Sequence, residues 1–405
     1  MRERSARAGG TGRRHGRITV ALANACLALI VVGFTLGALE VSLRTFPRLL
    51  PAGSYGAGRL DPELGMNVHD GRVLYNKTRF VERVANHDGF MDVDHELRER
   101  PGVLRVGFFG DSYVEAVQVP FDAVFFHQLE QHWRGEASIE TFGFGMSGWG
   151  TLHALRAYQV YGPRYGIDVA VYVFVENDPG DQMWEVAARR ESAGSTKPFL
   201  EASDDPPGYR VRAVASASNL PFWFAAAKFL QRNSLLVEVV RDRLEMLRQT
   251  GVRIRSDESQ VQMSPVAGAV PDSNDLPSTW PRELRTRAER LGEIMLEEWK
   301  ESTAAHGTRF LVLYVPRGET QLRGTVRRED TWLPWLESAC SKLGIPLIDP
   351  SAPLARRLAS GEHVYLDHWT PAGHEVIAEV LDRYLEPDPP QARPAGESAG
   401  RHGFE

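Results

Sequence analysis

The sequence has little cysteine, and its net charge is not of the sign that binds nucleic acids. Cys26 and Cys340 lie in segments so different in character that we expect no disulfide, and no Cys and His residues have zinc-ligand spacing. We therefore expect no metal and no cofactor. The formal net charge is -6, which argues against a nucleic-acid partner because such a partner favours a clustered basic surface. The 405 residues, 42% hydrophobic and 25% charged, are typical of a folded globular protein.

Charged residues are also absent from one long stretch near the N-terminus, Ile18 to Leu39. A helix of this length spans about 33 Å, close to the hydrocarbon thickness of a bilayer. Residues 1–17 contain six arginines and one glutamate, and the positive-inside rule keeps such a segment in the cytoplasm. We therefore expect a basic cytoplasmic segment (1–17), a single-pass anchor in the inner (cytoplasmic) membrane (18–39) and an extracytoplasmic remainder from Glu40.

Two other interpretations of the charge-free stretch stay open, a cleaved signal peptide and a buried core helix. The pair Arg13-Arg14 is compatible with a twin-arginine signal, although its flanking residues match that signal poorly. An anchor fits the length of the stretch best, because the apolar region of a secretory signal is usually only about 7 to 15 residues long.

Short apolar runs alternate with helical patterns along residues 103–385, which we expect to form the catalytic domain. Such alternation predicts a three-layer α/β/α sandwich around a mainly parallel sheet. The expected strands are Val103 to Phe109, Ser138 to Phe142, Val169 to Val175, Phe310 to Val315 and Pro346 to Asp349. The expected helices are Asp122 to Arg134, Thr151 to Tyr161, Glu283 to His306 and Pro371 to Leu385.

An insertion at 182–280 interrupts this alternation. Residues 221–250 carry a helical pattern, which is either a cap over the active site or a helical hairpin packed on the side of the domain. Residues 252–279 are rich in Ser, Asp and Pro, which predicts a loop or disorder. Outside the domain, we expect residues 40–102 to be an extension packed on it. We expect the tail 386–405 to be disordered.

Ser112 follows the first expected strand of the domain and precedes a helix, in the tetrapeptide Phe109-Gly110-Asp111-Ser112. The carboxyl end of a parallel strand exposes a side chain at the edge of the sheet, and the next turn offers backbone amides to a developing negative charge. This placement suits a nucleophile. The tripeptide Gly-Asp-Ser alone is weak evidence, because a chain of this length has about one chance in ten of containing it by chance.

Two loops further along add groups that stabilise an oxyanion. The turn Gly145 to Gly150 is rich in glycine, so its amides can approach a substrate closely. Asn177 follows the strand that ends at Val175, and its side-chain amide can donate to an oxyanion. Either loop taken alone is equally well read as an ordinary turn.

A histidine stands beside an acid shortly before the last helix, in Asp367-His368. A serine hydroxyl needs an adjacent base to become a strong nucleophile, and a histidine side chain can serve. Asp367 is the natural group to orient the ring. For His374, inside the helix, a structural role is the better interpretation.

With these residues together, the chain resembles the SGNH hydrolases, also called GDSL-type esterases and lipases, from about Leu104 to Leu385 outside the insertion. The resemblance implies a flavodoxin-like fold, Ser112 as nucleophile and His368 as general base. It implies an oxyanion hole made by Ser112, Gly148 and Asn177. The anchor, the segment 60–65 and the ending 368–374 are similar to bacterial envelope members of the family.

The sequence departs from the family pattern at two positions. Tyr113 replaces a leucine, a common variation. Members usually place the acid two or three residues before the histidine, whereas Asp367 is adjacent to His368. Neighbouring side chains of an extended segment point to opposite faces, so Asp367 reaches the ring only if the loop bends. Glu362 is the alternative acid, and a Ser112-His368 dyad is a further possibility.

We therefore expect an extracytoplasmic serine esterase that hydrolyses acyl, mainly acetyl, esters on envelope or exported glycans or on small molecules. The same acyl-enzyme would make an O-acyltransferase if a sugar hydroxyl replaced water. A catalytically silent glycan-binding scaffold is the third interpretation. Trp149 and Trp369 flank the site and are candidate stacking surfaces for a substrate, or else packing residues.

Overall fold

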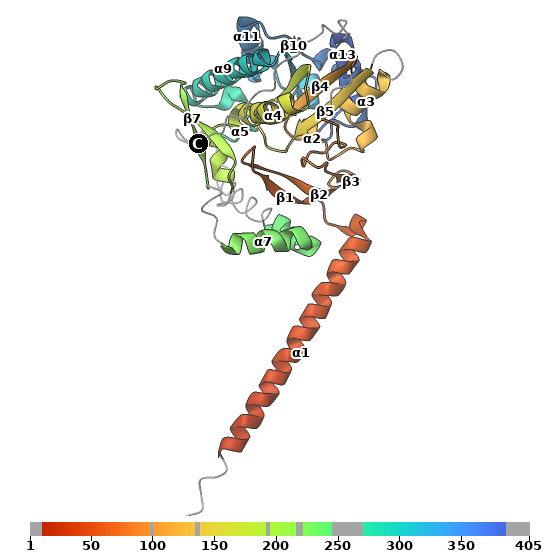
Figure 1. Cartoon of the computed structure of the whole chain (residues 1–405), viewed down its shortest axis with the longest axis vertical. Helices are drawn as coiled ribbons and strands as arrows, with labels where there is room; N and C mark the ends of the chain where they lie inside the picture. The colour runs from red at the N-terminus through yellow and green to blue at the C-terminus, as the bar shows by residue number, and fades with distance from the viewer. Residues whose placement is uncertain are drawn as a thin grey trace, which may run out of the picture.

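The computed structural model describes residues 10–97, 101–133, 138–191, 195–215, 222–244 and 270–385. The start of the expected basic segment, most of the expected loop 252–279 and the tail 386–405 therefore lie outside the described residues. The colour bar of Figure 1 marks the same ranges.

A five-stranded parallel sheet forms the centre of the protein, in the order β10-β9-β6-β4-β5. Its strands are β4 (Val103–Gly110), β5 (Ser138–Gly145), β6 (Val169–Val175), β9 (Arg309–Val315) and β10 (Leu347–Ile348). Alternate side chains of a strand belong to different cores: Tyr172 packs in one apolar cluster, and Val171 and Val173 pack in the other. Both faces of the sheet are therefore buried, which explains the continuous apolar runs of the sequence.

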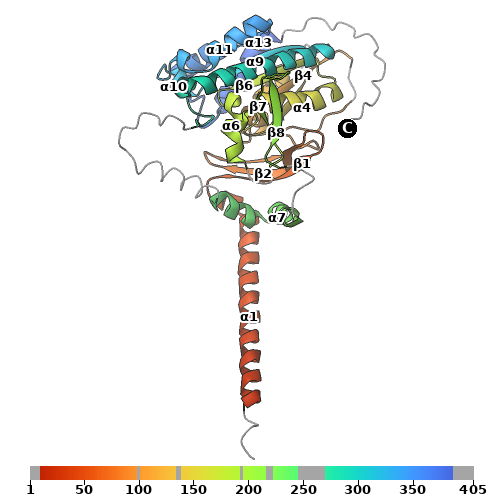
Figure 2. The ribbon, with the colours of Figure 1, turned by 90° about the vertical axis from the view of Figure 1, so that its left-hand side faces the viewer.

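Helices cover both faces of this sheet, which confirms the predicted three-layer α/β/α fold (Figures 1 and 2). One face is covered by α4 (Thr151–Arg164), α9 (Arg282–Ala305) and α11 (Leu333–Leu343). The other is covered by α3 (Phe125–His132), α12 (Ser351–Ala359) and α13 (Pro371–Tyr384). The start of α13 is set by Thr370, whose hydroxyl accepts a hydrogen bond from the amide of Gly373 at 3.2 Å, and by Pro371 in the first turn. The helix expected from Asp122 is broken at Val124, whose backbone is extended.

Short helices and a small hairpin connect these elements. The hairpin pairs β7 (Pro198–Ala202) with β8 (Tyr209–Ala213) inside the insertion. The short α-helices are α2 (Ser112–Glu115), α5 (Asp178–Asp181), α6 (Trp184–Ala187) and α10 (Glu319–Leu322). The 3-10 helices are η1 (Pro47–Leu49), η2 (Phe121–Ala123), η3 (Ala188–Arg190), η5 (Pro277–Thr279) and η6 (Arg328–Asp330).

A three-stranded antiparallel sheet precedes the central domain, and the sequence analysis did not predict it. It consists of β1 (Ser54–Asp61), β2 (Met66–Asn76) and β3 (Phe80–Val84), with β2 in the middle. Its side chains alternate only partly between buried and exposed, and its first two strands contain glycines, so the period of two is weak in the sequence.

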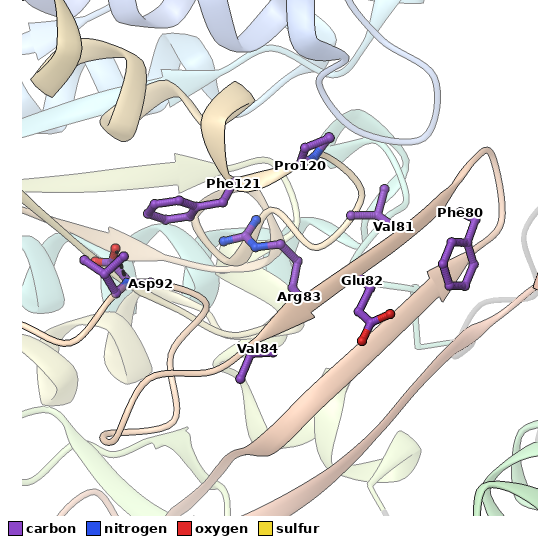
Figure 3. Close-up of a pocket in the computed structure, with 9 residues that line it drawn as sticks. Phe80, Val81, Glu82, Arg83, Val84, Asp92, Pro120 and Phe121 are labelled. Carbon is purple, nitrogen blue, oxygen red and sulfur yellow. Dashed lines mark hydrogen bonds between the residues drawn. The ribbon is translucent and has the colours of Figure 1, made fainter. Parts of the chain in front are cut away.

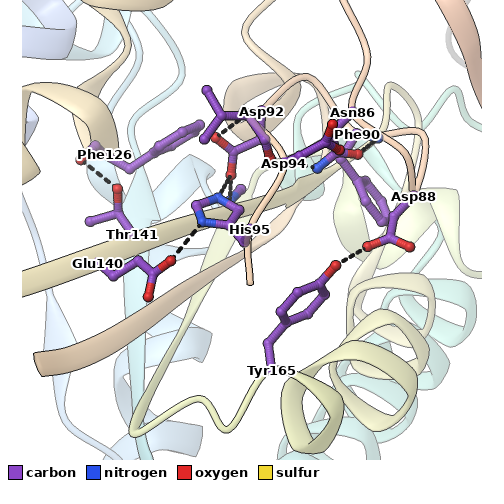
Figure 4. Close-up of polar contacts among 12 residues, drawn as sticks. Asn86, Asp88, Phe90, Asp92, Asp94, His95, Phe126, Glu140, Thr141 and Tyr165 are labelled. Carbon is purple, nitrogen blue, oxygen red and sulfur yellow. Dashed lines mark hydrogen bonds and ion pairs between the residues drawn. The ribbon is translucent and has the colours of Figure 1, made fainter. Parts of the chain in front are cut away.

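A buried polar cluster joins the segment after this sheet to β5 (Figure 4). The two ring nitrogens of His95 lie 3.1 Å from Asp92 and 3.1 Å from Glu140, and Asp92 also accepts a 2.7 Å hydrogen bond from the amide of Gly143. Burial opposes the charge of His95, but the two carboxylates outweigh burial and raise its pKa to about 9. The imidazolium therefore ties the extension to the strand that leads into the Gly148 turn.

The first helix, α1 (Gly10–Thr45), projects away from the rest of the protein (Figures 1 and 2). Its stretch Val20–Thr45 is long and apolar enough to cross a membrane, and its most apolar part is not buried by the protein. At its C-terminal end lie two of the helices of the insertion, α7 (Phe222–Asn233) and the helix at residues 235–244. These helices contact the β1–β2 sheet through Leu235, which packs beside Tyr55 and Leu74.

Candidate active site

Ser112 lies at the carboxyl end of β4, as the first residue of α2. The carboxylate of Asp111 caps this short helix by accepting a 2.9 Å hydrogen bond from the amide of Tyr113. The turn is tightly packed against the end of β5, since a Cβ atom at Gly145 would lie 2.5 Å from the amide nitrogen of Glu115. The backbone around the serine is thus held in place by both neighbouring segments.

His368 meets Ser112 although the two residues are 256 positions apart in the chain. Its Nε2 lies 2.7 Å from the hydroxyl oxygen of Ser112. The ring packs against Tyr113, with 4.8 Å between the ring centroids. A serine hydroxyl hydrogen-bonded to an imidazole is the arrangement that activates a serine nucleophile.

Asp367 lies on the other side of the same ring. Its Oδ1 is 3.5 Å from Nδ1 of His368, a contact that becomes an ion pair when the ring is protonated, and Nδ1 makes no hydrogen bond among the described residues. Contact with the imidazole, supported by a hydrogen bond from Tyr75, lowers the pKa of Asp367 to about 2. Asp367 is therefore a carboxylate at neutral pH.

The loop bends where the sequence required a bend. The amide of Leu366 donates a 2.9 Å hydrogen bond to the carbonyl of His368, and Tyr365 and Trp369 form an isolated antiparallel bridge around it. This turn brings the adjacent side chains of Asp367 and His368 to the same place. The alternative acid, Glu362, is instead paired with Arg357 at 3.0 Å on the surface.

The expected oxyanion donors follow two further strands, Gly148 after β5 and Asn177 after β6, and of the two only Asn177 lines a cavity together with Ser112. The Asn177 side chain lines the same cavity as Ser112 and His368, and its Nδ2 donates a 2.6 Å hydrogen bond to Asp181. Gly148 has a φ of 75°, a left-handed conformation that glycine adopts without strain. Among the described residues, the backbone amides of Ser112 and Gly148 donate to no protein acceptor.

A buried glutamate connects the nucleophile helix to the Gly148 turn, and the sequence analysis missed it. Glu115 accepts hydrogen bonds from the hydroxyl of Ser147 and from His69 on β2. Burial would raise the pKa of Glu115, but these two partners outweigh it and lower that pKa. The sequence could have indicated Glu115 only through its position, one helical turn after Ser112. Its partner on β2 had no such signal.

A cavity of about 700 Å³ opens onto these residues. Ser112, Asn177, Asp367 and His368 lie in its wall. The wall beyond them is mixed: it includes the polar residues Asn274, Arg317, Thr320 and His363 and the apolar residues Val315, Pro316 and Leu366. None of the described residues of α7 or 235–244 lines this cavity. The structure therefore favours the side-packed interpretation of the insertion helices over an active-site cap.

Several buried acids lie behind the nucleophile. Burial raises the pKa of Asp111 to about 7 and that of Glu176 to about 7, and it also raises the pKa values of Asp178 and Asp181. Glu176 accepts a 2.7 Å hydrogen bond from the phenol of Tyr314. Among the described residues, no group of three or more His, Cys, Asp or Glu side chains is arranged to hold a metal ion.

The expected stacking role of the two tryptophans is corrected by their burial. Trp149 is 2% exposed and packs against Phe90, and Trp369 is 1% exposed and donates a hydrogen bond to Tyr365. Neither ring offers a face to a substrate. Both tryptophans belong to the cores on which the site is built. His374 is likewise buried and stacks on Phe125, in line with its expected structural role.

A second cavity, of about 370 Å³, lies beside β3 and η2 (Figure 3). The guanidinium of Arg83 projects there over the ring of Phe121. Its donors are already engaged by the carbonyls of Met91, Ala116 and Val119. Arg83 therefore braces the loop that follows the nucleophile helix and leaves little capacity for a ligand.

The fold and the site define a class: an α/β/α protein with a Ser-His nucleophilic site and a neighbouring carboxylate at the carboxyl edge of its sheet. No family model and no curated protein matches the sequence. Among solved structures, the chain is similar to a lipase/acylhydrolase from Enterococcus faecalis (12% identity, 71% of this chain and 100% of that chain, TM-score 0.35). It is also similar to a member of the lipolytic protein G-D-S-L family from Veillonella parvula (10% identity, 70% of this chain and 98% of that chain, TM-score 0.32). A third similar structure is the acetyl xylan esterase AlAXEase (11% identity, 70% of this chain and 100% of that chain, TM-score 0.36). A likeness this distant establishes neither activity nor substrate.

Proposed function

We propose that the protein is a serine esterase of the SGNH type. The observation that carries the proposal is the 2.7 Å contact between the Ser112 hydroxyl and Nε2 of His368, at the mouth of a cavity that also holds Asn177. The carboxylate of Asp367 completes the site, because a carboxylate beside an imidazole stabilises the imidazolium formed during proton transfer.

The proposed reaction has two halves. Ser112 attacks the ester carbonyl while His368 takes its proton, and the oxyanion is held by the amides of Ser112 and Gly148 and by the side chain of Asn177. His368 then protonates the departing alcohol, which leaves an acyl group on Ser112. Water, deprotonated by His368, attacks this acyl-enzyme and releases the acid.

We propose acyl esters, mainly acetyl esters, on envelope or exported glycans as substrates. The four polar residues Asn274, Arg317, Thr320 and His363 in the otherwise mixed wall support an alcohol with hydroxyl groups, since such groups need hydrogen-bond partners when they are desolvated. The unburied apolar helix α1 supports a single-pass anchor in the inner membrane, and the arginines before it support an extracytoplasmic catalytic domain.

Labelling with a fluorophosphonate tests the nucleophile. We expect Ser112 to be labelled and Ser112→Ala to abolish labelling while its circular dichroism spectrum is unchanged. Labelling of another residue would contradict the assignment. Turnover of a small acetyl ester, with and without an oligosaccharide acceptor, then separates hydrolysis from acyl transfer: release of acetate that is unaffected by the acceptor supports an esterase, and acetylated oligosaccharide supports a transferase.

A further inference from the structure

The helix at 235–244 has one face that nothing in the described part of the chain covers. Val237, Val240 and Leu244 lie on this face by their helical spacing, and Val240 and Leu244 are 49% and 61% exposed. The opposite face is buried, with Leu235 and Val239 packed on the β1–β2 sheet. One apolar face of this helix packs on the protein, whereas the other apolar face is exposed. The exposed face needs a partner that covers it.

The preceding helix, α7, also carries exposed apolar side chains. Phe229 and Leu230, near its C-terminal end, are 66% and 55% exposed. Side chains this apolar are usually exposed singly on soluble proteins, whereas contiguous groups mark interaction surfaces. We call the five residues Phe229, Leu230, Val237, Val240 and Leu244 the apolar patch.

The position of the patch relative to α1 is set by specific hydrogen bonds. The carboxylate of Glu40 accepts from the hydroxyl of Ser234 and from the amides of Leu235 and Leu236, at 2.9, 3.0 and 2.9 Å. Glu40 thus caps the start of the second helix. Arg44 donates a 2.8 Å hydrogen bond to the carbonyl of Asn233 from the same side of α1.

These bonds hold the patch at the level where the charge-free stretch 18–39 ends. Figures 1 and 2 show α7 and its neighbour at the level of the C-terminal end of α1, below the β1–β2 sheet in these views. A bilayer around residues 18–39 therefore has its surface at this level. Exposed basic residues stand there too, namely Arg44, Arg48 and Arg241.

We propose that the apolar patch lies in the membrane interface and seats the catalytic domain on the lipid surface; the proposal rests on the membrane anchoring proposed above. Amphipathic helices bury their apolar face at the boundary between headgroups and acyl chains, and nearby arginines attract anionic headgroups. The anchor and the patch then form two attachments, and the second restricts the rotation of the domain about the first.

Fluorescence quenching by lipid tests this arrangement on the full chain in vesicles of phosphatidylglycerol and phosphatidylcholine brominated in their acyl chains. One sample carries an environment-sensitive fluorophore on the native Cys26, within the anchor. The others use a Cys26→Ala background with a label at Val240→Cys, at Phe229→Cys or, as control, at Glu301→Cys on α9. The buried Cys340 is inaccessible to the reagent.

We expect brominated lipid to quench the labels at positions 26, 229 and 240 by about twofold or more and to leave the label at 301 unchanged. Quenching at 26 without quenching at 229 and 240 would overturn the patch proposal and leave the anchor intact. The patch would then be covered by protein, either a second copy or another segment of the chain, and not by lipid. Absence of quenching at 26 would overturn the anchor, and the patch proposal with it.

A matched pair of variants links the quenching to the patch. Leu244→Asp should reduce quenching of the label at Phe229→Cys, because a carboxylate is costly to place among acyl chains. Val211→Asp is the control, since Val211 is an exposed apolar residue on β8, outside the patch. Equal effects of the two substitutions would contradict the proposal. Fluorophosphonate labelling of Ser112 reports in each variant that the catalytic domain is folded.

Discussion

The phenol of Tyr75 donates a 3.0 Å hydrogen bond to Oδ2 of Asp367, across 292 positions of the chain. Tyr75 lies on β2, in the N-terminal sheet, whereas Asp367 lies beside the candidate general base. The same sheet contacts the nucleophile helix through His69, which binds Glu115, and through Arg83, which binds the carbonyl of Ala116. The extension is thus part of the framework that holds the candidate catalytic residues.

We predict that Asp367→Asn reduces kcat strongly, by up to about 10⁴-fold, the loss that the equivalent change causes in the serine-protease triad. The reason is that a neutral amide stabilises neither the correct tautomer nor the imidazolium. Steady-state turnover of an acetyl ester measures this effect. A loss below about tenfold would assign the reaction to a Ser112-His368 dyad, because Glu362 is held away by Arg357.

We predict that Tyr75→Phe reduces kcat by about tenfold, because a hydrogen bond to a charged group is worth about 1.5 to 3 kcal/mol. The effect should disappear in an Asp367→Asn background if Tyr75 acts through the acid, and a double-mutant cycle measures this coupling. A purely structural role of Tyr75 would give the same loss in both backgrounds. Tyr55→Phe, on the neighbouring strand β1, is the control.

Removal of one oxyanion donor should leave a measurable enzyme. We predict that Asn177→Ala loses about 10²- to 10³-fold in kcat, as expected for one donor among three. KM should change little, because the interaction strengthens in the transition state. Wild-type kcat in this variant would remove Asn177 from the oxyanion hole.

The contact between Glu115 and Ser147 should matter for the turn that carries Gly148. We predict that Ser147→Ala lowers kcat by about tenfold with KM nearly unchanged, because the turn loses a hydrogen bond to a buried carboxylate. Ser147→Thr keeps the hydroxyl and should restore most of the activity. Equal activity of the alanine and threonine variants would show that this hydrogen bond does not position the turn.

Protein stability should fall between about pH 6.5 and 9 because of His95. Its pKa in the folded protein, about 9, is above the ordinary value of 6.5, so its stabilisation is fully present below pH 6.5 and is lost as the pH rises through 9. At about 1.4 kcal/mol per pKa unit, the contribution is of the order of 3 kcal/mol. Thermal unfolding in detergent at pH 6 to 10 measures it. His95→Gln should flatten the decline, and an equally steep decline in that variant would contradict the assignment.

The strands and helices of the central domain followed from the sequence because both faces of a parallel sheet are buried. The apolar run Val169 to Val175 was predicted with the bounds that β6 has, and the run at Val103 ended one residue short of the observed Gly110. The positions of Ser112 and Asn177 followed for a related reason, whereas His368 was assigned from its place beside an acid before the last helix and from the family resemblance. The carboxyl ends of parallel strands meet at one edge, so residues placed after them converge.

The contacts between separate parts of the chain were decided only by the tertiary structure. No spacing in the sequence relates Tyr75 to Asp367 or His69 to Glu115, because each pair depends on how the N-terminal sheet packs on the domain. The burial of Trp149 depends on the same packing, and the bend at Asp367 depends on a backbone hydrogen bond. The sequence by itself determined the fold of the central domain and the candidate reactive residues. Tertiary packing determined which residues orient these side chains. The periodicity of a sequence indicates on which face of its own helix or strand a residue lies, but not which distant residue it contacts.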